Sequence, residues 1–196
     1  MGLFLDAANE WYDLLDVSYH FVIGRKNIAR QLNISFRIGD FDHLSGIQHA
    51  SDVDFGLHRN EYRGVRLVPA LRSGKLSDTL IEKSMEWSSI SGRLSAIIGL
   101  KRILETDFEI YAFESYKLRF HSEIKAKYCV YSEELEIGVF LFLNETGRCL
   151  YCKSVFQKDN RDYRKNQARW IVLQKRKIEN GTETLLYQNA SYHENT

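Results

Sequence analysis

The chain has 196 residues, of which 44% are hydrophobic and 27% are charged, and its formal net charge is +1. These values are close to the globular average and exclude the disordered and fibrous classes, while the length fits a single domain. No apolar run reaches the roughly 18 residues that span a bilayer, and acidic residues near the start exclude a signal peptide, so we expect a cytoplasmic protein with no membrane partner.

The first half of the sequence predicts helices around one small hairpin. Apolar residues recur at helical spacing over about residues 3–16, which indicates an amphipathic first helix. Two short alternating tracts follow and predict a hairpin over residues 17–38. Asp40 is a favourable N-cap for the short helix that follows. The pattern is helical again from about 59 to 106, so we expect a helical half over about residues 1–106.

The second half changes to a period of two, which predicts strands. Five tracts carry it: FEIYAF, LRFHSEIKAKYCVY, IGVFLFLN, CLYCKSVF and RWIVLQKRKI. Their connections are short, so neighbouring strands should be antiparallel, in a sheet over about residues 107–187 followed by a polar, frayed tail over 188–196. In the second tract, alternation puts even-numbered residues from Phe120 to Val130 on one face and odd-numbered residues from His121 to Lys127 on the other. The predicted fold class is α+β, in one domain.

Most catalytic and metal-binding motifs have no counterpart in the sequence. Cys149 and Cys152 form a C-x-x-C inside a predicted strand, where residues three apart point to opposite faces and share no metal. The sequence contains no G-x-S-x-G, Walker or G-x-G-x-x-G motif. We therefore expect no metal and no cofactor, and strand thiols that are buried or half-buried.

Positive charge is concentrated near the end of the chain. Residues 153–178 contain nine basic and two acidic residues, so this stretch carries +7 and the remainder −6. Tyr163 and Trp170 lie among these bases, and clustered cations with aromatic rings suit a phosphate backbone and unstacked bases. The alternative is a solvated strand edge, where lysine also blocks aggregation.

His43 is the most informative single residue. It falls in the first turn of the short helix predicted after Asp40, where the helix dipole disfavours imidazolium and leaves a neutral ring able to act as a base. The alternative is a histidine packed against Phe41 and the core. RNA suits chemistry of this kind, because its 2′-hydroxyl attacks the adjacent phosphate when a base removes the proton and a cation stabilises the developing charge.

Four segments, FDHLSGI, HSEIKAKY, VFLFL and DYRKNQARWIVLQKRKI, resemble in order and spacing the phage-associated, group-four branch of the Barnase–EndoU–Colicin–RelE nuclease superfamily. The resemblance extends from about Tyr12 to Lys177. It implies N-terminal helices packed on a four- or five-stranded antiparallel sheet. It also implies a metal-independent, toxin-like ribonuclease of a bacterial mobile element or phage.

The resemblance further implies which residues form the site. The family's histidine-leucine motif falls on His43 and Leu44, its serine-containing strand on Ser122, Ile124, Ala126 and Tyr128, and its tyrosine-to-glutamine segment on Tyr163 and Gln167. His43 is then the general base or acid, Lys125 or a nearby arginine steadies the phosphate, and Ser122 or Tyr128 contributes a hydrogen bond. Alternation puts Ser122 and Lys125 on opposite faces, so both line one pocket only if a bulge intervenes. Seven residues are expected to bind RNA: Lys153, Tyr163, Arg164, Lys165, Gln167, Arg169 and Trp170.

A second hypothesis remains open at this point. The same fold can serve as a non-catalytic binding protein that blocks a host defence or nucleic-acid-processing protein. The partners expected are therefore RNA and, in addition, a cognate antidote or a host protein.

Overall fold

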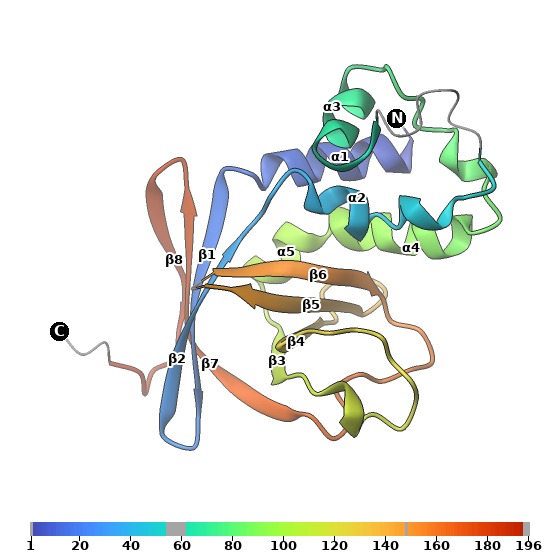
Figure 1. The fold of residues 1–196 in the computed structure, drawn as a ribbon. Coiled ribbons are helices and arrows are strands. Elements are labelled where there is room, and N and C mark those ends of the chain that lie inside the picture. The colour runs from blue at the N-terminus through green and yellow to red at the C-terminus, as the bar shows by residue number, and fades with distance from the viewer. Residues whose placement is uncertain (1, 54–61, 148, 194–196) are drawn as a thin grey trace.

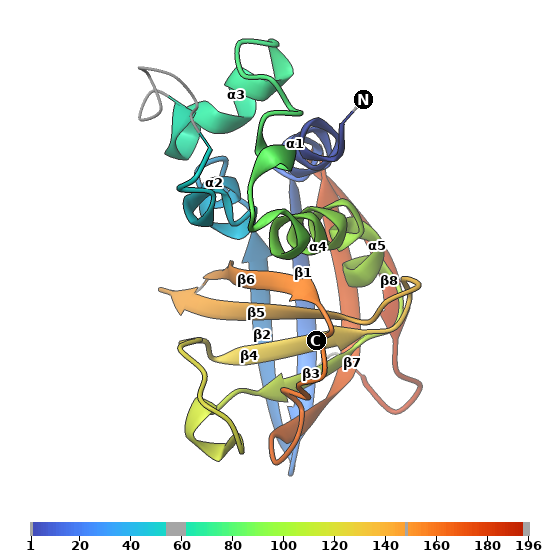
Figure 2. The same ribbon diagram turned by 90° about the vertical axis from the view of Figure 1, so that its right-hand side faces the viewer.

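The computed structural model describes residues 2–53, 62–147 and 149–193 (Figure 1). Within this part of the chain the α-helices gather at one end of the molecule, above the strands (Figures 1 and 2). The α-helices are α1 (Leu3–Asp13), α2 (Asp40–Leu44), α3 (Leu67–Arg72), α4 (Trp87–Ile98) and α5 (Leu100–Glu105). The strands are β1 (Val17–Arg25), β2 (Ile28–Ser35), β3 (Glu109–Ala112), β4 (Tyr128–Ser132), β5 (Val139–Thr146), β6 (Cys149–Gln157), β7 (Ala168–Glu179) and β8 (Thr182–Gln188).

Seven of the eight strands close into a barrel. Their order is β1-β2-β6-β5-β4-β3-β7, and β7 pairs again with β1, while β8 is attached to β7 outside the ring. Strands β1, β2, β7 and β8 cross strands β3 to β6 (Figure 2). All neighbours are antiparallel except β2 and β6, which are parallel over two residue pairs.

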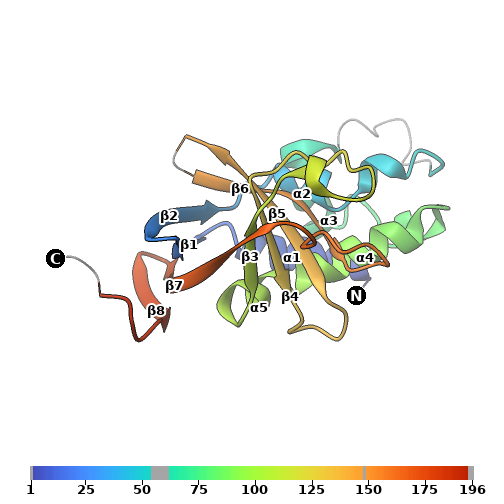
Figure 3. The ribbon, with the colours of Figure 1, turned by 90° about the horizontal axis from the view of Figure 1, so that it is seen from below.

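The predicted fold, N-terminal helices packed on a four- or five-stranded antiparallel sheet, is wrong. The N-terminal hairpin is part of the same sheet as the C-terminal strands, because β1 pairs with β7 from Val17–Glu179 to Gly24–Ile171. Strand β7 has twelve residues and holds β3 at its start, β1 along most of its length and β8 at its end (Figure 3). The pairings between β1 and β7 join residues about 150 positions apart in the sequence. A local period of two carries no information about such distant partners.

Local sequence still explains the individual elements. The β1–β2 hairpin turns at Lys26 and Asn27, both with positive φ, which is the conformation that a tight two-residue turn needs. Ile90, Leu94 and Ile97 recur at helical spacing and are fully buried on α4. The predicted helical region from about 59 begins outside the described residues, and between α3 and α4 the structure has turns and a short 3₁₀ helix, Ile81–Lys83.

Two apolar clusters fill the molecule. The larger one joins the helices to the inside of the barrel and includes Trp11, Phe41 and Tyr19. The smaller one lies on the other face of β3, β4 and β5, with Phe140 and Phe142 among its members and Tyr163 packed over them. Strand β5 is therefore buried on both faces from Val139 to Leu143. No helix in the described part of the chain is long and apolar enough to cross a membrane.

The predicted alternation in the segment before β4 holds only in part. From His121 to Lys127 the odd-numbered side chains are exposed, while Phe120, Ile124 and Ala126 pack on the smaller cluster. The chain bends at Lys127, and β4 begins only at Tyr128. Beyond the bend the even-numbered residues Tyr128 and Val130 belong to the larger cluster instead. The prediction that all even-numbered residues share one face is therefore wrong.

Candidate functional site

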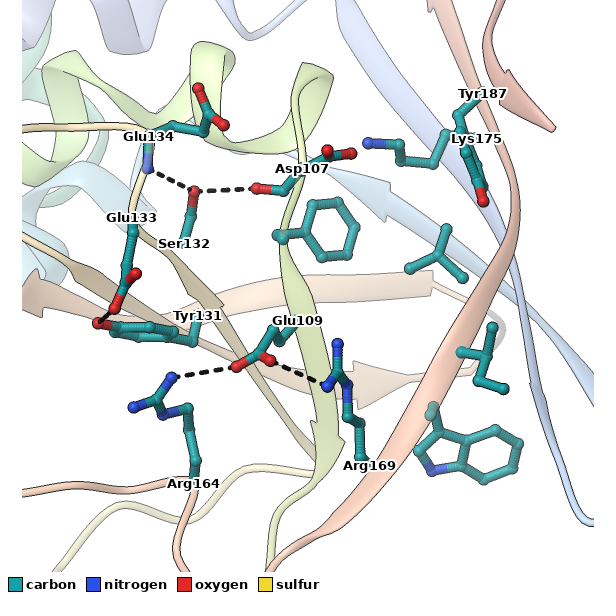
Figure 4. A pocket seen from close by; sticks show the side chains of 14 residues that line it. Asp107, Glu109, Tyr131, Ser132, Glu133, Glu134, Arg164, Arg169, Lys175 and Tyr187 are labelled. Carbon is teal, nitrogen blue, oxygen red and sulfur yellow. Dashed lines mark hydrogen bonds and ion pairs between the residues drawn. The ribbon is translucent and has the colours of Figure 1, made fainter. Parts of the chain in front are cut away.

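Among the cavities that the described residues form, two have similar volumes, about 640 and 650 Å³. The first lies among β3, β4, β7 and β8 (Figure 4). The second, here called the α4–β6 groove, lies between α4, residues 121–124, β6 and the loop over residues 157–163. Their charges are arranged differently, and this difference decides which of them suits a ligand.

The first cavity holds charges that neutralise one another (Figure 4). Arg164 and Arg169 each place a guanidinium nitrogen 3.1 Å from a different oxygen of the Glu109 carboxylate. The Tyr131 hydroxyl donates to Glu133 at 2.7 Å. The ions and polar groups that line this cavity are thus largely satisfied within the fold, which is typical of a structural network.

Lys175 strengthens the same structural interpretation. Only 4% of this residue is exposed, and its ammonium group donates to the Thr106 carbonyl oxygen. It also lies over the Phe108 ring, 4.9 Å from the ring centroid. Burial lowers the pKa of Lys175. The buried cation of this cavity already has its partners.

The α4–β6 groove has a different character, because one of its two arginines, Arg93, has no carboxylate partner among the described residues. Arg93, on α4, is partly buried, and no described acidic side chain forms an ion pair with it. Its guanidinium carbon lies 5.8 Å from the centroid of the Phe156 ring. Burial lowers the pKa of Arg93, but guanidinium remains charged in proteins. A partly desolvated cation without an anion is a site for an anion from solution.

The chain makes room for Arg93 with a glycine. Gly46 has φ +80°, and a Cβ atom there would lie 2.8 Å from Cδ of Arg93. Gly46 follows α2 directly, so the turn that ends this helix brings it against the arginine stem. Any larger residue would combine backbone strain with displacement of Arg93.

His43 lies on α2, outside the lining of the groove but near enough for the charge of Arg93 to act on its imidazole. The helix begins at Asp40 with Gly39 as its N-cap, so the prediction that Asp40 caps it is wrong, and His43 is the fourth of five helical residues. The ring is solvent-accessible, yet partial burial lowers its pKa, and the charges of Lys153 and Arg93 lower it further. The predicted direction of the shift is confirmed, but burial and two cations cause it in place of the helix dipole.

A β-bulge places Lys153 at this position. Phe142 pairs with Ser154 and Leu143 with Cys152, which leaves Lys153 as the extra residue of β6. Bulges re-aim side chains and are frequent beside functional sites. The ammonium group of Lys153 lowers the pKa of His43 while the Lys153 backbone raises it, so the irregular strand and the short helix meet at the imidazole.

The structure brings together one part of the residue set predicted from sequence. Ser122 and Tyr163 line the α4–β6 groove, and His43 and Lys153 meet beside it. The Tyr163 ring is 3% exposed and lies 5.1 to 5.5 Å from four phenylalanine rings. Burial raises the pKa of Tyr163, so the phenol keeps its proton.

The other predicted residues lie elsewhere. Lys125 is exposed and does not line the groove, and the Tyr128 hydroxyl accepts a hydrogen bond from Arg30 at 3.5 Å. Arg164 and Arg169 belong to the first cavity, Lys165 is exposed, and Trp170 is buried in the larger cluster. Cys149 is exposed and Cys152 buried, which corrects the prediction that both are at least half-buried.

The positive stretch near the C-terminus is largely neutralised in three dimensions. Five of its bases form ion pairs, most of them with glutamates from β3, α5, β7 and β8: Arg161, Arg164, Arg169, Arg176 and Lys177. The sequence count of +7 therefore overstates the charge that this stretch presents to a ligand.

Gln167 holds the loop that covers the smaller cluster. Its amide oxygen accepts from the Glu114 backbone N–H at 2.9 Å, and its amide nitrogen donates to the Glu114 carbonyl at 3.1 Å. Replacing Gln167 with alanine should lower the free energy of unfolding by about 1–3 kcal/mol, because two partly buried backbone groups lose their partners. Urea denaturation measures this change. Lys165→Ala, at an exposed neighbour, is the control, and equal stabilities of the two variants would contradict this role.

Sequence reasoning missed Arg93, His121 and Arg161 as groove residues. For Arg93 a signal was available, because this charged residue lies next to the apolar stripe of α4. Arginine is rarely buried unless it has a partner. His121 and Arg161 carry no comparable signal, because exposed histidines and arginines are common.

Comparison with known proteins gives one match. The family model described as phage-Barnase-EndoU-ColicinE5/D-RelE like nuclease4 matches residues 4–191. No curated protein and no solved structure matches the chain.

Proposed function

The chain belongs to the family of phage Barnase-EndoU-ColicinE5/D-RelE like nucleases, and on this premise we propose that it is a metal-independent ribonuclease that acts in the α4–β6 groove. The observation that carries the proposal is Arg93, a partly buried cation that no described acidic side chain pairs with and whose charge acts on the imidazole of His43. In this proposal His43 removes a proton and Arg93 binds an anion. RNA cleavage requires this pair.

In the proposed reaction His43 is the general base. Its lowered pKa keeps the imidazole neutral near pH 7, so it accepts the proton of the 2′-hydroxyl as the 2′-oxygen attacks phosphorus. Arg93 holds the phosphate oxygens and stabilises the charge that develops on them. Lys153 adds positive charge beside the imidazole, and the Ser122 hydroxyl contributes a hydrogen bond from the opposite wall.

Incubation of the purified protein with total RNA in excess chelator tests the proposal. The wild type should cleave RNA to fragments that end in a 2′,3′-cyclic phosphate, and expression in bacteria should arrest growth. Binding of RNA with steep salt dependence but without cleavage would favour the non-catalytic alternative. A protein that neither cleaves nor binds RNA would point to a host or antidote protein as the partner.

The pH dependence of the reaction follows from the position of His43. A base whose pKa is lowered stays deprotonated to lower pH. The value of kcat/KM should therefore fall only below pH 6.5, the ordinary pKa of imidazole. In Lys153→Gln the acid limb should move upward, because removal of one cation makes the imidazolium less unfavourable. The acid limbs of the two proteins are measured as pH profiles of kcat/KM at constant ionic strength. Lys26→Gln at the exposed hairpin turn is the control, and identical limbs in the wild type and Lys153→Gln would contradict the assignment.

A further inference from the structure

Cleavage by the 2′-hydroxyl requires two proton transfers, and His43 accounts for one of them. The bond from the 2′-oxygen to phosphorus forms while the bond from phosphorus to the 5′-oxygen breaks, and the electron pair of the broken bond stays on the 5′-oxygen. That oxygen is a poor leaving group until it receives a proton. A second group must therefore supply a proton near the Arg93 end of the phosphate.

His121 lies in a suitable position for this second transfer. It is exposed and lines the α4–β6 groove together with Arg93, on the wall formed by residues 121–124. His43 belongs to a different element, α2, and the charge of the same arginine lowers the pKa of its imidazole. Two imidazoles from separate parts of the chain are thus associated with one guanidinium, to which no described acidic side chain is paired.

The wall that carries His121 is firmly anchored. The neighbouring Phe120 ring packs edge-on against Tyr163, with 5.1 Å between ring centroids, and Arg161 lies 6.0 Å from the Phe120 centroid. On the other side the Ser122 hydroxyl accepts from the Ile124 backbone N–H at 3.3 Å. A side chain between two fixed neighbours is held where it can meet a bound substrate.

The other titratable groups that line the groove are poorly suited to give a proton near pH 7. Partial burial raises the pKa of Asp159, but hydrogen bonds from Arg161 outweigh burial and lower it overall, so this carboxylate has no proton to donate. Tyr163 is nearly inaccessible, and burial raises the pKa of its phenol. Arg93 and Arg161 remain charged. Imidazole is the side chain that changes charge near neutral pH.

We propose that His121 is the general acid that protonates the leaving 5′-oxygen, in a pair with the base His43. This inference rests on the proposed ribonuclease function and names a second catalytic residue in the same groove. After cleavage His43 carries the proton taken from the 2′-hydroxyl, and His121 is left neutral. Proton exchange with water restores both.

A pair of substrates separates an acid from a residue that only binds. In a dinucleoside phosphate the leaving group is a 5′-hydroxyl, whereas in uridine 3′-(4-nitrophenyl phosphate) it is nitrophenolate, which departs without a proton. His121→Ala should lower kcat on the dinucleoside phosphate about 10²- to 10⁴-fold and change kcat on the nitrophenyl ester only a few-fold. The alkaline limb of the pH profile should disappear with it. His43→Ala should lose activity on both substrates.

His193→Ala, at an exposed histidine far along the chain, is the matched control and should behave as the wild type on both substrates. Equal losses on the two substrates in His121→Ala would overturn the assignment as a general acid, and so would an unchanged rate on the dinucleoside phosphate. Failure of the wild type to cleave either substrate would instead remove the ribonuclease proposal, and the assignment of His121 with it.

Discussion

Replacing His43 with alanine should lower kcat for RNA cleavage about 10²- to 10⁴-fold, because the 2′-hydroxyl then loses the base that removes its proton. The imidazole is solvent-accessible, so its removal leaves no cavity in the core. The free energy of unfolding should therefore change by less than about 0.5 kcal/mol. Single-turnover cleavage of an end-labelled RNA measures the rate, and urea denaturation measures the stability.

His49→Ala provides the matched control for this variant. His49 is also exposed, on the 3₁₀ helix Ile47–His49 that follows α2, and its Nε2 atom lies 3.3 Å from the amide nitrogen of Gln48. Its variant should cleave at the wild-type rate. A His43→Ala protein that is folded and still cleaves RNA at the wild-type rate would sink the proposed mechanism.

Replacing Arg93 with methionine should abolish most of the activity without harming the fold. Removing one preorganised donor to developing negative charge typically costs about 10²- to 10³-fold in kcat, and Arg93 is proposed to supply such donors. Arg93→Lys should recover part of the rate, since it restores the charge but not the planar fork that matches two phosphate oxygens. Steady-state kinetics should show kcat decreasing in the order wild type, Arg93→Lys, Arg93→Met.

The stability of Arg93→Met distinguishes a functional from a structural arginine. Methionine keeps most of the apolar stem contacts, and it removes a partly buried charge that no described acidic side chain pairs with. The free energy of unfolding should remain the same or rise by about 1 kcal/mol. Lys26→Gln controls for the loss of one charge. If Arg93→Met is strongly destabilised, the arginine holds the fold together and the proposed role in phosphate binding loses its support.

The local elements could be inferred from the sequence with fair accuracy. The hairpin predicted over residues 17–38 contains β1 and β2, and the helix predicted over 3–16 contains α1. The tract VFLFL, apolar on both faces, is buried on both faces in β5. Each of these features depends on residues close in sequence, where the periods of helix and strand act directly.

The site was predictable only in part, for a physical reason that the charges illustrate. His43 was identified from its place in a predicted short helix, and Ser122 through a segment that resembles a nuclease family; Ser122 lines the groove, and the charge of the groove's Arg93 acts on His43. Arg164 and Arg169 were assigned to RNA from the same basic stretch, yet both are bound to Glu109, about 55 to 60 positions earlier in the chain. A charge count along the sequence cannot show which ions find partners in the folded protein.

The sequence by itself determined the alternation, the helical stripes and the family, because these are properties of neighbouring residues and of their order. Only the tertiary structure decided that β1 closes the sheet against β7 and that a bulge at Lys153 meets His43. The tertiary structure also decided that no described acidic side chain pairs with Arg93. Such features arise from contacts between distant segments, whose free energy depends on burial and pairing that no local pattern encodes.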